Sequence, residues 1–105
     1  MAYTVIYQVY RKADMSQEEF VDYWTDVHCP IAAALPHVQR YTNYSVSEAT
    51  NAYEPAPDGF TILEFADKSA FEAAMSSPEM AASAADAANF TSHFGIHCVN
   101  THPVV

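Results

Sequence analysis

The stretch FVDYWTDVHCPIAAALPHVQRY, residues 20–41, combines a helical pattern with the start of a strand. Its apolar and aromatic positions recur in steps of three and four residues, which forms one stripe along a helix with a period of 3.6 residues. The stripe comprises Phe20, Trp24, Val27, His28, Ile31 and Leu35. Pro36 ends the pattern, and Pro30 is expected to kink or interrupt the helix just after Cys29. The stretch therefore predicts a helix with one face packed against a sheet.

The start of this helix is marked by a capping box. Ser16 is the expected N-cap, and Glu19 follows at the required spacing of three residues. A second helix is expected to begin at Ser69, with Glu72 at the same spacing, and an alanine-rich segment follows with Pro78 at a first helical position. Two helical regions are therefore predicted.

Runs rich in β-branched and aromatic residues predict four strands. These runs cover residues 3–10, 38–46, 59–65 and 93–100, and a loop with two prolines is expected over residues 47–58. The order β-α-β-β-α-β is the ferredoxin-like arrangement, an α+β fold with a four-stranded antiparallel sheet. Helices on one face leave the other face bare and largely apolar, which predicts a homodimer through the sheet faces.

Composition limits the classes of partner. The chain has 105 residues, the size of one domain, with 13 acidic and 4 basic residues and a net charge of −9. This charge disfavours nucleic acids and anionic membranes. The chain has no apolar run of the ~20 residues that a membrane span needs and no N-terminal signal pattern. A cytoplasmic protein with reduced cysteines is therefore expected.

Several motifs resemble the EthD-like family of small dimeric α+β-barrel proteins. They are Tyr-Arg-Lys at residues 10–12, Phe-x-x-Tyr-Trp at 20–24, Val-His-x-Pro at 27–30, Leu-Pro at 35–36 and Arg-Tyr at 40–41. DGFTILEF at 58–65 and SAFEAAMSSPEM at 69–80 also resemble the family, so the likeness covers roughly residues 3–90.

The resemblance implies a single EthD-like domain over residues 1–105 and a dimeric barrel. Members or close relatives are tied to polyketide cyclisation, dehydration or decarboxylation and to lactone isomerisation. The third strand lacks the cysteine of the lactone isomerases, and Ile62 and Glu64 reverse the acidic-then-aromatic order of many relatives. Isomerase chemistry is therefore disfavoured.

His28 is the main catalytic candidate. An imidazole can take or give a proton near neutral pH, and a half-buried cleft can tune it. The alternative is a buried histidine bonded to a strand carbonyl. Tyr7, Tyr41 and Tyr44 are strand tyrosines whose phenols could hold an enolate or carbonyl oxygen, although a packing role is the plainer interpretation. Trp24 is expected to wall the same cleft.

Two further residues are candidates for binding substrate. Glu64 is either a carboxylate facing the pocket or part of a salt bridge at the strand edge. His97 is a candidate second pocket histidine. His93 shares its strand face but lies ~13 Å away at 3.3 Å per residue, which argues against a metal site.

These residues favour an enzyme of the lyase or cyclase/isomerase type that works without a cofactor. It would perform proton transfer on a small hydrophobic oxygenated compound, in the form of cyclisation, dehydration or decarboxylation of a polyketide-like or aromatic carbonyl. No phosphate-binding motif supports nucleotide chemistry. Two alternatives remain, a non-catalytic small-molecule-binding or accessory dimer and a cofactor-free monooxygenase.

Overall fold

The structure is a computed structural model that describes residues 2–51 and 53–105. The loop expected over 47–58 includes residue 52, which lies outside the described residues. No helix in the described ranges is long and apolar enough to cross a membrane.

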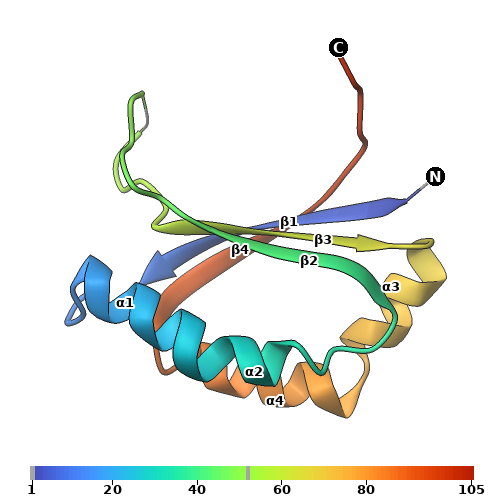
Figure 1. The fold of residues 1–105 in the computed structure, drawn as a ribbon, viewed down its shortest axis with the longest axis horizontal. Helices are drawn as coiled ribbons and strands as arrows, with labels where there is room; N and C mark the ends of the chain where they lie inside the picture. Colours follow the sequence, from blue (N-terminus) through green and yellow to red (C-terminus); the bar gives the residue numbers. More distant parts are fainter. Residues whose placement is uncertain (1, 52) are drawn as a thin grey trace.

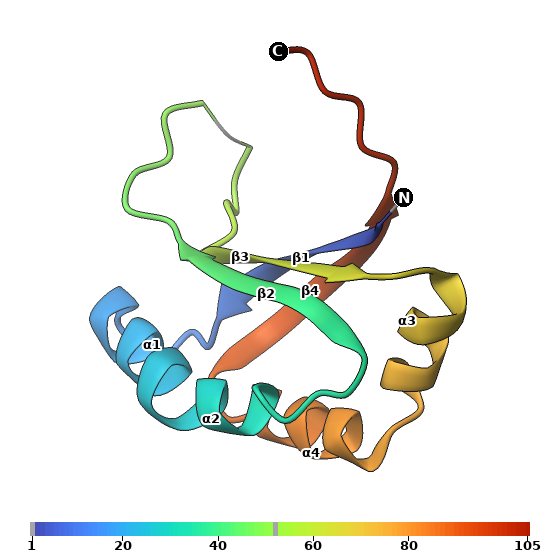
Figure 2. The same cartoon turned by 45° about the vertical axis from the view of Figure 1, so that its right-hand side comes forward.

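Four strands form one antiparallel sheet, which confirms the α+β, ferredoxin-like prediction. They are β1 (Tyr3–Arg11), β2 (Val38–Ser45), β3 (Gly59–Phe65) and β4 (Thr91–Val99), in the order β2-β3-β1-β4. All the helices lie on one side of this sheet (Figures 1 and 2). β4 begins two residues earlier than expected, because Arg11 pairs with Thr91 beyond an irregularity in the ladder.

The first helical region is continuous through its proline. α1 (Gln17–Tyr23) leads into a π-helical turn, η1 (Trp24–His28), and then into α2 (Cys29–Ala32), and Figure 1 shows them as one helical run. The expected interruption of the helix at Pro30 is therefore wrong, because the helical run continues through the proline. The N–H of Cys29 bonds to the carbonyl of Trp24, five residues back. This wider turn accommodates the chain ahead of the proline, which lacks an N–H of its own.

The π turn also shifts the buried stripe. Because each of its residues turns the chain by a smaller angle, steps of four residues stay on one face. Phe20, Trp24 and His28 are buried as predicted, but Val27 is 42% exposed and Ala32 is buried. The prediction that Val27 belongs to the buried stripe is thus wrong, because it assumed an uninterrupted 3.6-residue period.

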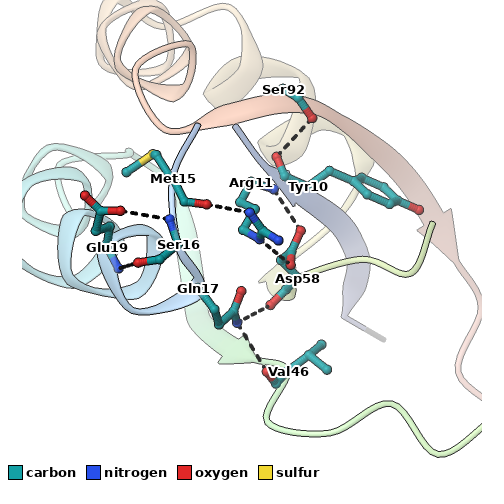
Figure 3. Close-up of polar contacts among 9 residues, drawn as sticks. All are labelled: Tyr10, Arg11, Met15, Ser16, Gln17, Glu19, Val46, Asp58 and Ser92. Carbon is teal, nitrogen blue, oxygen red and sulfur yellow. Dashed lines mark hydrogen bonds and ion pairs between the residues drawn. The ribbon is translucent and has the colours of Figure 1, made fainter. Parts of the chain in front are cut away.

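The capping box at the start of α1 is confirmed. The Glu19 N–H donates to Ser16 Oγ over 3.1 Å, and the Ser16 N–H donates to Glu19 Oε1 over 2.9 Å (Figure 3). The same close-up shows what holds α1 to the sheet. Arg11 pairs with Asp58 over 3.3 Å, and Gln17 Nε2 donates to the carbonyl of Asp58 and to that of Val46.

The second helical region contains α3 (Lys68–Met75) and α4 (Pro78–Ala87). α3 does not start at Ser69, because Asp67 is its N-cap and accepts a hydrogen bond from the Ala70 N–H over 2.8 Å. Ser69 lies in the first turn of the helix. Pro78 opens α4 as predicted, with Ser77 as the N-cap.

The core lies between the helices and the sheet. Its largest fully buried side chains are those of Phe20, Phe65, Phe90, Leu63 and Val5. Val5 of β1 is buried under the helices and pairs with Leu63 of β3 and with Cys98 of β4. These three positions, and every second residue from each along its strand, therefore face the helices. This register decides which sequence candidates can reach a common site.

Candidate functional site

A cavity of about 230 Å³ lies between the helix layer and the sheet. The helical regions contribute Trp24, His28, Met75, Met80, Ser83, Ala84 and Ala87. The strands and the turn before β4 contribute Tyr7, Val9, Tyr41, Thr61, Leu63, Phe90, Thr91, Phe94 and Ile96. The wall is mostly apolar with a few polar groups, which is the usual make-up of a small-molecule site.

Trp24 is placed by a glycine on the opposite strand. A Cβ at Gly59 would lie 2.4 Å from a carbon of the Trp24 ring, so this position of β3 has no room for a side chain. The Trp24 ring also packs against Phe20 and Phe90, with centroids 5.3 and 6.3 Å away. Trp24 therefore forms one wall of the cavity, as the sequence predicts.

His28 forms a buried pair with Asp86. Its Nδ1 lies 2.8 Å from Asp86 Oδ2, and the two side chains are 8% and 10% exposed. A carboxylate only accepts hydrogen bonds, so Nδ1 donates and carries the proton. Nε2 then faces Ser83, whose Oγ lies 3.5 Å away, and both residues line the cavity. The alternative of a strand-carbonyl partner is wrong, because both partners come from α4.

Three donors surround the Asp86 carboxylate. Besides His28, Tyr23 donates its hydroxyl over 2.7 Å and Asn89 donates its side-chain amide over 3.2 Å. Burial alone would raise the pKa of Asp86, but the hydrogen bonds from Tyr23, His28 and Asn89 outweigh it and lower the pKa. The carboxylate is therefore held in its ionised form beside the imidazole.

Tyr7 and Tyr41 both line the cavity, as expected. The Tyr7 hydroxyl makes a long contact of 3.8 Å with Met75 Sδ, which leaves it available to a stronger acceptor. Burial raises the pKa of Tyr7 and of Tyr41. Both phenols therefore stay protonated near neutral pH and can donate a hydrogen bond to a ligand.

Tyr44, Glu64 and His97 are not brought to this cavity. Alternate strand residues point to opposite faces, and these three lie on the face that no helix covers. Tyr44 is 50% exposed, and Glu64 pairs with Arg40 over 3.6 Å, which is the salt bridge that the sequence left open.

His97 has its partner on the same uncovered face. Its Nε2 lies 3.2 Å from Gln8 Oε1 on the neighbouring strand, and the side chain is exposed. Within residues 2–51 and 53–105, no three His, Cys, Asp or Glu side chains gather in a way that would hold a metal ion.

The sequence interpretation missed Ser83 and Asp86. In the run AASAADAA, residues 81–88, they are the only residues other than alanine. They are three residues apart, so they lie on the same face of a helix. That isolated polar pair was the available signal, but it did not show that His28, 58 residues away from Asp86, would meet it.

The fold and the sequence motifs together define a protein of the ferredoxin-like α+β class with a cavity under its helices. The EthD domain profile matches residues 12–93, and the chain therefore belongs to the EthD family. No protein with a curated description matches the sequence.

Solved structures support the same fold. An EthD family protein from Bacillus halodurans superposes with a TM-score of 0.80 at 16% identity, covering 97% of this chain and 100% of that one. A dimeric protein with a ferredoxin-like fold from Bacteroides fragilis gives 0.71 at 9% identity, covering 95% and 96%. A mutant form of SnoaB, a cofactor-independent oxygenase from Streptomyces nogalater, gives 0.62 at 14% identity, covering 99% and 98%.

Proposed function

We propose that this chain is an enzyme that needs no cofactor and transfers a proton next to the carbonyl of a small hydrophobic compound. The observation that carries the proposal is the buried His28–Asp86 pair in the wall of an apolar cavity. Cyclisation, dehydration or decarboxylation of a polyketide-like or aromatic precursor would use such a site. Membership in the EthD family agrees with this range of chemistry.

Each residue has a distinct role in the proposed reaction. The free Nε2 of His28 takes a proton from the carbon beside the carbonyl, and Asp86 holds Nδ1–H and stabilises the imidazolium that forms. A phenol of Tyr7 or Tyr41 donates a hydrogen bond to the developing enolate oxygen. The Trp24 ring forms one side of the cavity and limits the access of water to the reacting atoms. In a cyclisation or a dehydration the imidazolium then gives this proton to the new alkoxide or to the leaving hydroxyl, whereas in a decarboxylation CO2 leaves without a base and Nε2–H only protonates the enolate that remains.

Two alternatives remain testable beside this proposal. The cavity alone would also suit a non-catalytic binding protein or accessory dimer, which predicts a retained ligand without turnover. A cofactor-free monooxygenase is the other, favoured only by the fold shared with SnoaB. Oxygen consumption distinguishes the monooxygenase from both other functions.

The test is a turnover screen of the wild type against His28→Asn. The asparagine amide can still donate to Asp86, so the buried carboxylate keeps a partner while the base is removed. Both proteins are incubated with aromatic and polyketide-like carbonyl compounds, and products are identified by chromatography with mass detection and an oxygen electrode. We expect at least a hundredfold loss of turnover in the variant, since general bases contribute about 10²–10⁴-fold.

His93→Asn is the matched control. His93 is exposed on the uncovered sheet face, stacked on Tyr10, and does not line the cavity. Its variant should retain wild-type turnover, and circular dichroism should show that both variants are folded. Turnover of folded His28→Asn within threefold of wild type would contradict the proposed role.

We also propose that residues 1–105 form one domain that assembles as a homodimer through the uncovered sheet faces. Ile6 and Ile62 lie opposite each other on the central strands of that face, and Phe60 and Tyr44 lie beside them. These side chains form an apolar surface that none of the helices within residues 2–51 and 53–105 covers. Structural neighbours from Bacteroides fragilis and Thermobifida fusca are described as dimeric, which supports a dimer without saying which face forms it.

A further inference from the structure

We infer that the cavity binds an uncharged ring compound with one or two oxygen groups, such as an aromatic ketone or phenol, and rejects carboxylates and phosphates. The inference rests on the proposed function only in taking this cavity as the substrate site. The positions of the basic residues limit the charge of the substrate, and the volume of the cavity limits its size.

The charge limit comes from where the cations lie. The chain has four basic residues, Arg11, Lys12, Arg40 and Lys68, and none of them lines the cavity. Arg11 pairs with Asp58, and Arg40 pairs with Glu64 on the uncovered face. An anion that entered the cavity would lose its hydration without gaining a basic side chain of this chain as a counterion.

The His28–Asp86 pair adds to this exclusion. With a neutral imidazole the pair carries a charge of −1, and with a protonated imidazole it carries none. The first state repels an anion from inside an apolar wall where charges are poorly screened, and in the second Asp86 already balances the imidazolium, so the pair has no net charge to attract one. The net charge of −9 on the whole chain acts in the same direction at long range.

The polar groups of the wall suit a neutral oxygen instead. The phenols of Tyr7 and Tyr41 and the hydroxyl of Ser83 are uncharged donors that line the cavity. Such donors bind a carbonyl or hydroxyl without the cost of pairing a buried charge. Met75, Met80 and other apolar side chains make up most of the remaining wall and would contact the ring.

The size limit follows from the volume. An engineered apolar cavity of about 150 Å³ holds benzene. At about 230 Å³, this cavity has room for a substituted ring or a compact two-ring compound. Because the charge limit disfavours carboxylates, decarboxylation of a free acid is the least suited of the three proposed reactions to this site.

Binding can be measured without any turnover. The chain has a single tryptophan, Trp24, which lines the cavity, so quenching of its fluorescence reports occupancy of the site. Shape-matched pairs are titrated at pH 7.5 by calorimetry and by fluorescence: 2-hydroxyacetophenone against salicylate, and 2-acetonaphthone against 2-naphthoate. We expect each ketone to bind at least tenfold more tightly than its acid partner and to quench Trp24.

Two lysine variants test whether the missing cation is the cause. Ala84 is exposed and lines the cavity, so Ala84→Lys places a charge at its rim without burying it. Ala82→Lys adds the same charge to an exposed position of the same helix, two residues away and outside the cavity wall. We expect Ala84→Lys to improve binding of the two acids at least tenfold and Ala82→Lys less than twofold.

Three results would overturn the inference. They are equal or tighter binding of the acids by wild type, no binding of either ketone up to its solubility limit, and an equal gain in both lysine variants. The last would assign the exclusion to net charge and not to the cavity. Ketone binding with no turnover would leave this inference standing while counting against the proposed enzymatic function.

Discussion

At the scale of single residues, the site depends on a carboxylate that is buried and yet ionised. Asp86 accepts three hydrogen bonds, from His28, Tyr23 and Asn89, and these lower its pKa in spite of burial. Asp86 in turn fixes which nitrogen of His28 carries the proton, and leaves Nε2 as the base. A histidine in the same cavity without this partner would be free to adopt the other tautomer.

Asp86→Asn tests this positioning role. The amide keeps the shape but removes the charge that stabilises the imidazolium, so we expect kcat on any substrate found in the screen to fall by roughly 10²-fold or more. KM should stay within threefold, since Asp86 does not line the cavity. Nitrogen-15 NMR of His28 should show a mixture of tautomers where the wild type shows Nδ1–H. A kcat near wild type with a single tautomer would contradict the role.

The same substitution should change how stability depends on pH. A carboxyl whose folded pKa is lowered stabilises the fold above its unfolded pKa, about 3.9 for Asp, and this contribution is lost as pH falls through the folded pKa. Urea unfolding at pH 7 should therefore show the wild type as more stable than Asp86→Asn, with the gap shrinking as the pH is lowered below 4. A gap that is constant with pH would mean that Asp86 acts only by packing.

At the scale of helices and strands, local signals predicted the elements well. Ser16 and Glu19 cap α1 through contacts between residues three apart. Both partners therefore lie within a short window of sequence, and the cap could be recognised without knowing the fold. The strand runs were found because β-branched and aromatic residues concentrate there. The second N-cap was misplaced because Ser69 and Glu72 match the same pattern, whereas Asp67 caps the helix alone.

Substitutions at Asp67 and Ser69 test which of the two residues caps α3. Asp67→Ala removes the side chain that accepts the Ala70 N–H, and such N-cap losses cost about 1 kcal/mol of folding free energy. Ser69→Ala changes an exposed residue inside the helix and should alter stability by less than about 0.5 kcal/mol. Urea unfolding of both variants measures the difference. A larger loss in Ser69→Ala would restore Ser69 as the cap.

The site was less predictable than the elements because it is assembled by long-range contacts. Spacing placed Trp24 and His28 on one face, and alternation placed Tyr7 beside them. Asp86 joins them only because α4 packs along η1, which no local pattern encodes.

The misplaced candidates have a related cause. Tyr44, Glu64 and His97 were separated from the cavity by register, since one residue of shift moves a strand side chain to the other face. Val27 was misjudged because the π turn departs from the regular helical period. The strand errors concern a register that neighbouring strands impose, whereas the Val27 error concerns a change of helical period within the run itself.

At the scale of the whole molecule, the sheet has one face covered by helices and one that is not (Figure 2). The uncovered face holds apolar residues on its two central strands, with Ile6 directly opposite Ile62. Polar contacts flank this apolar centre and reach the edge strands: Arg40 on β2 pairs with Glu64 on β3, and His97 on β4 contacts Gln8 on β1. An apolar centre with a polar rim is the usual composition of a stable protein interface.

Ile62→Lys is expected to break the proposed dimer. A lysine here would bring a charge into the apolar centre of the proposed interface, and removing that charge from water costs free energy that weakens association. Light scattering after size exclusion should give the wild type a mass twice the 11.6 kDa of the chain and the variant a mass of one chain. Val27→Lys is the control, because Val27 is an equally apolar side chain exposed on the helical layer, and its variant should remain dimeric. A wild type that runs as a single chain at micromolar concentration would contradict the proposed homodimer.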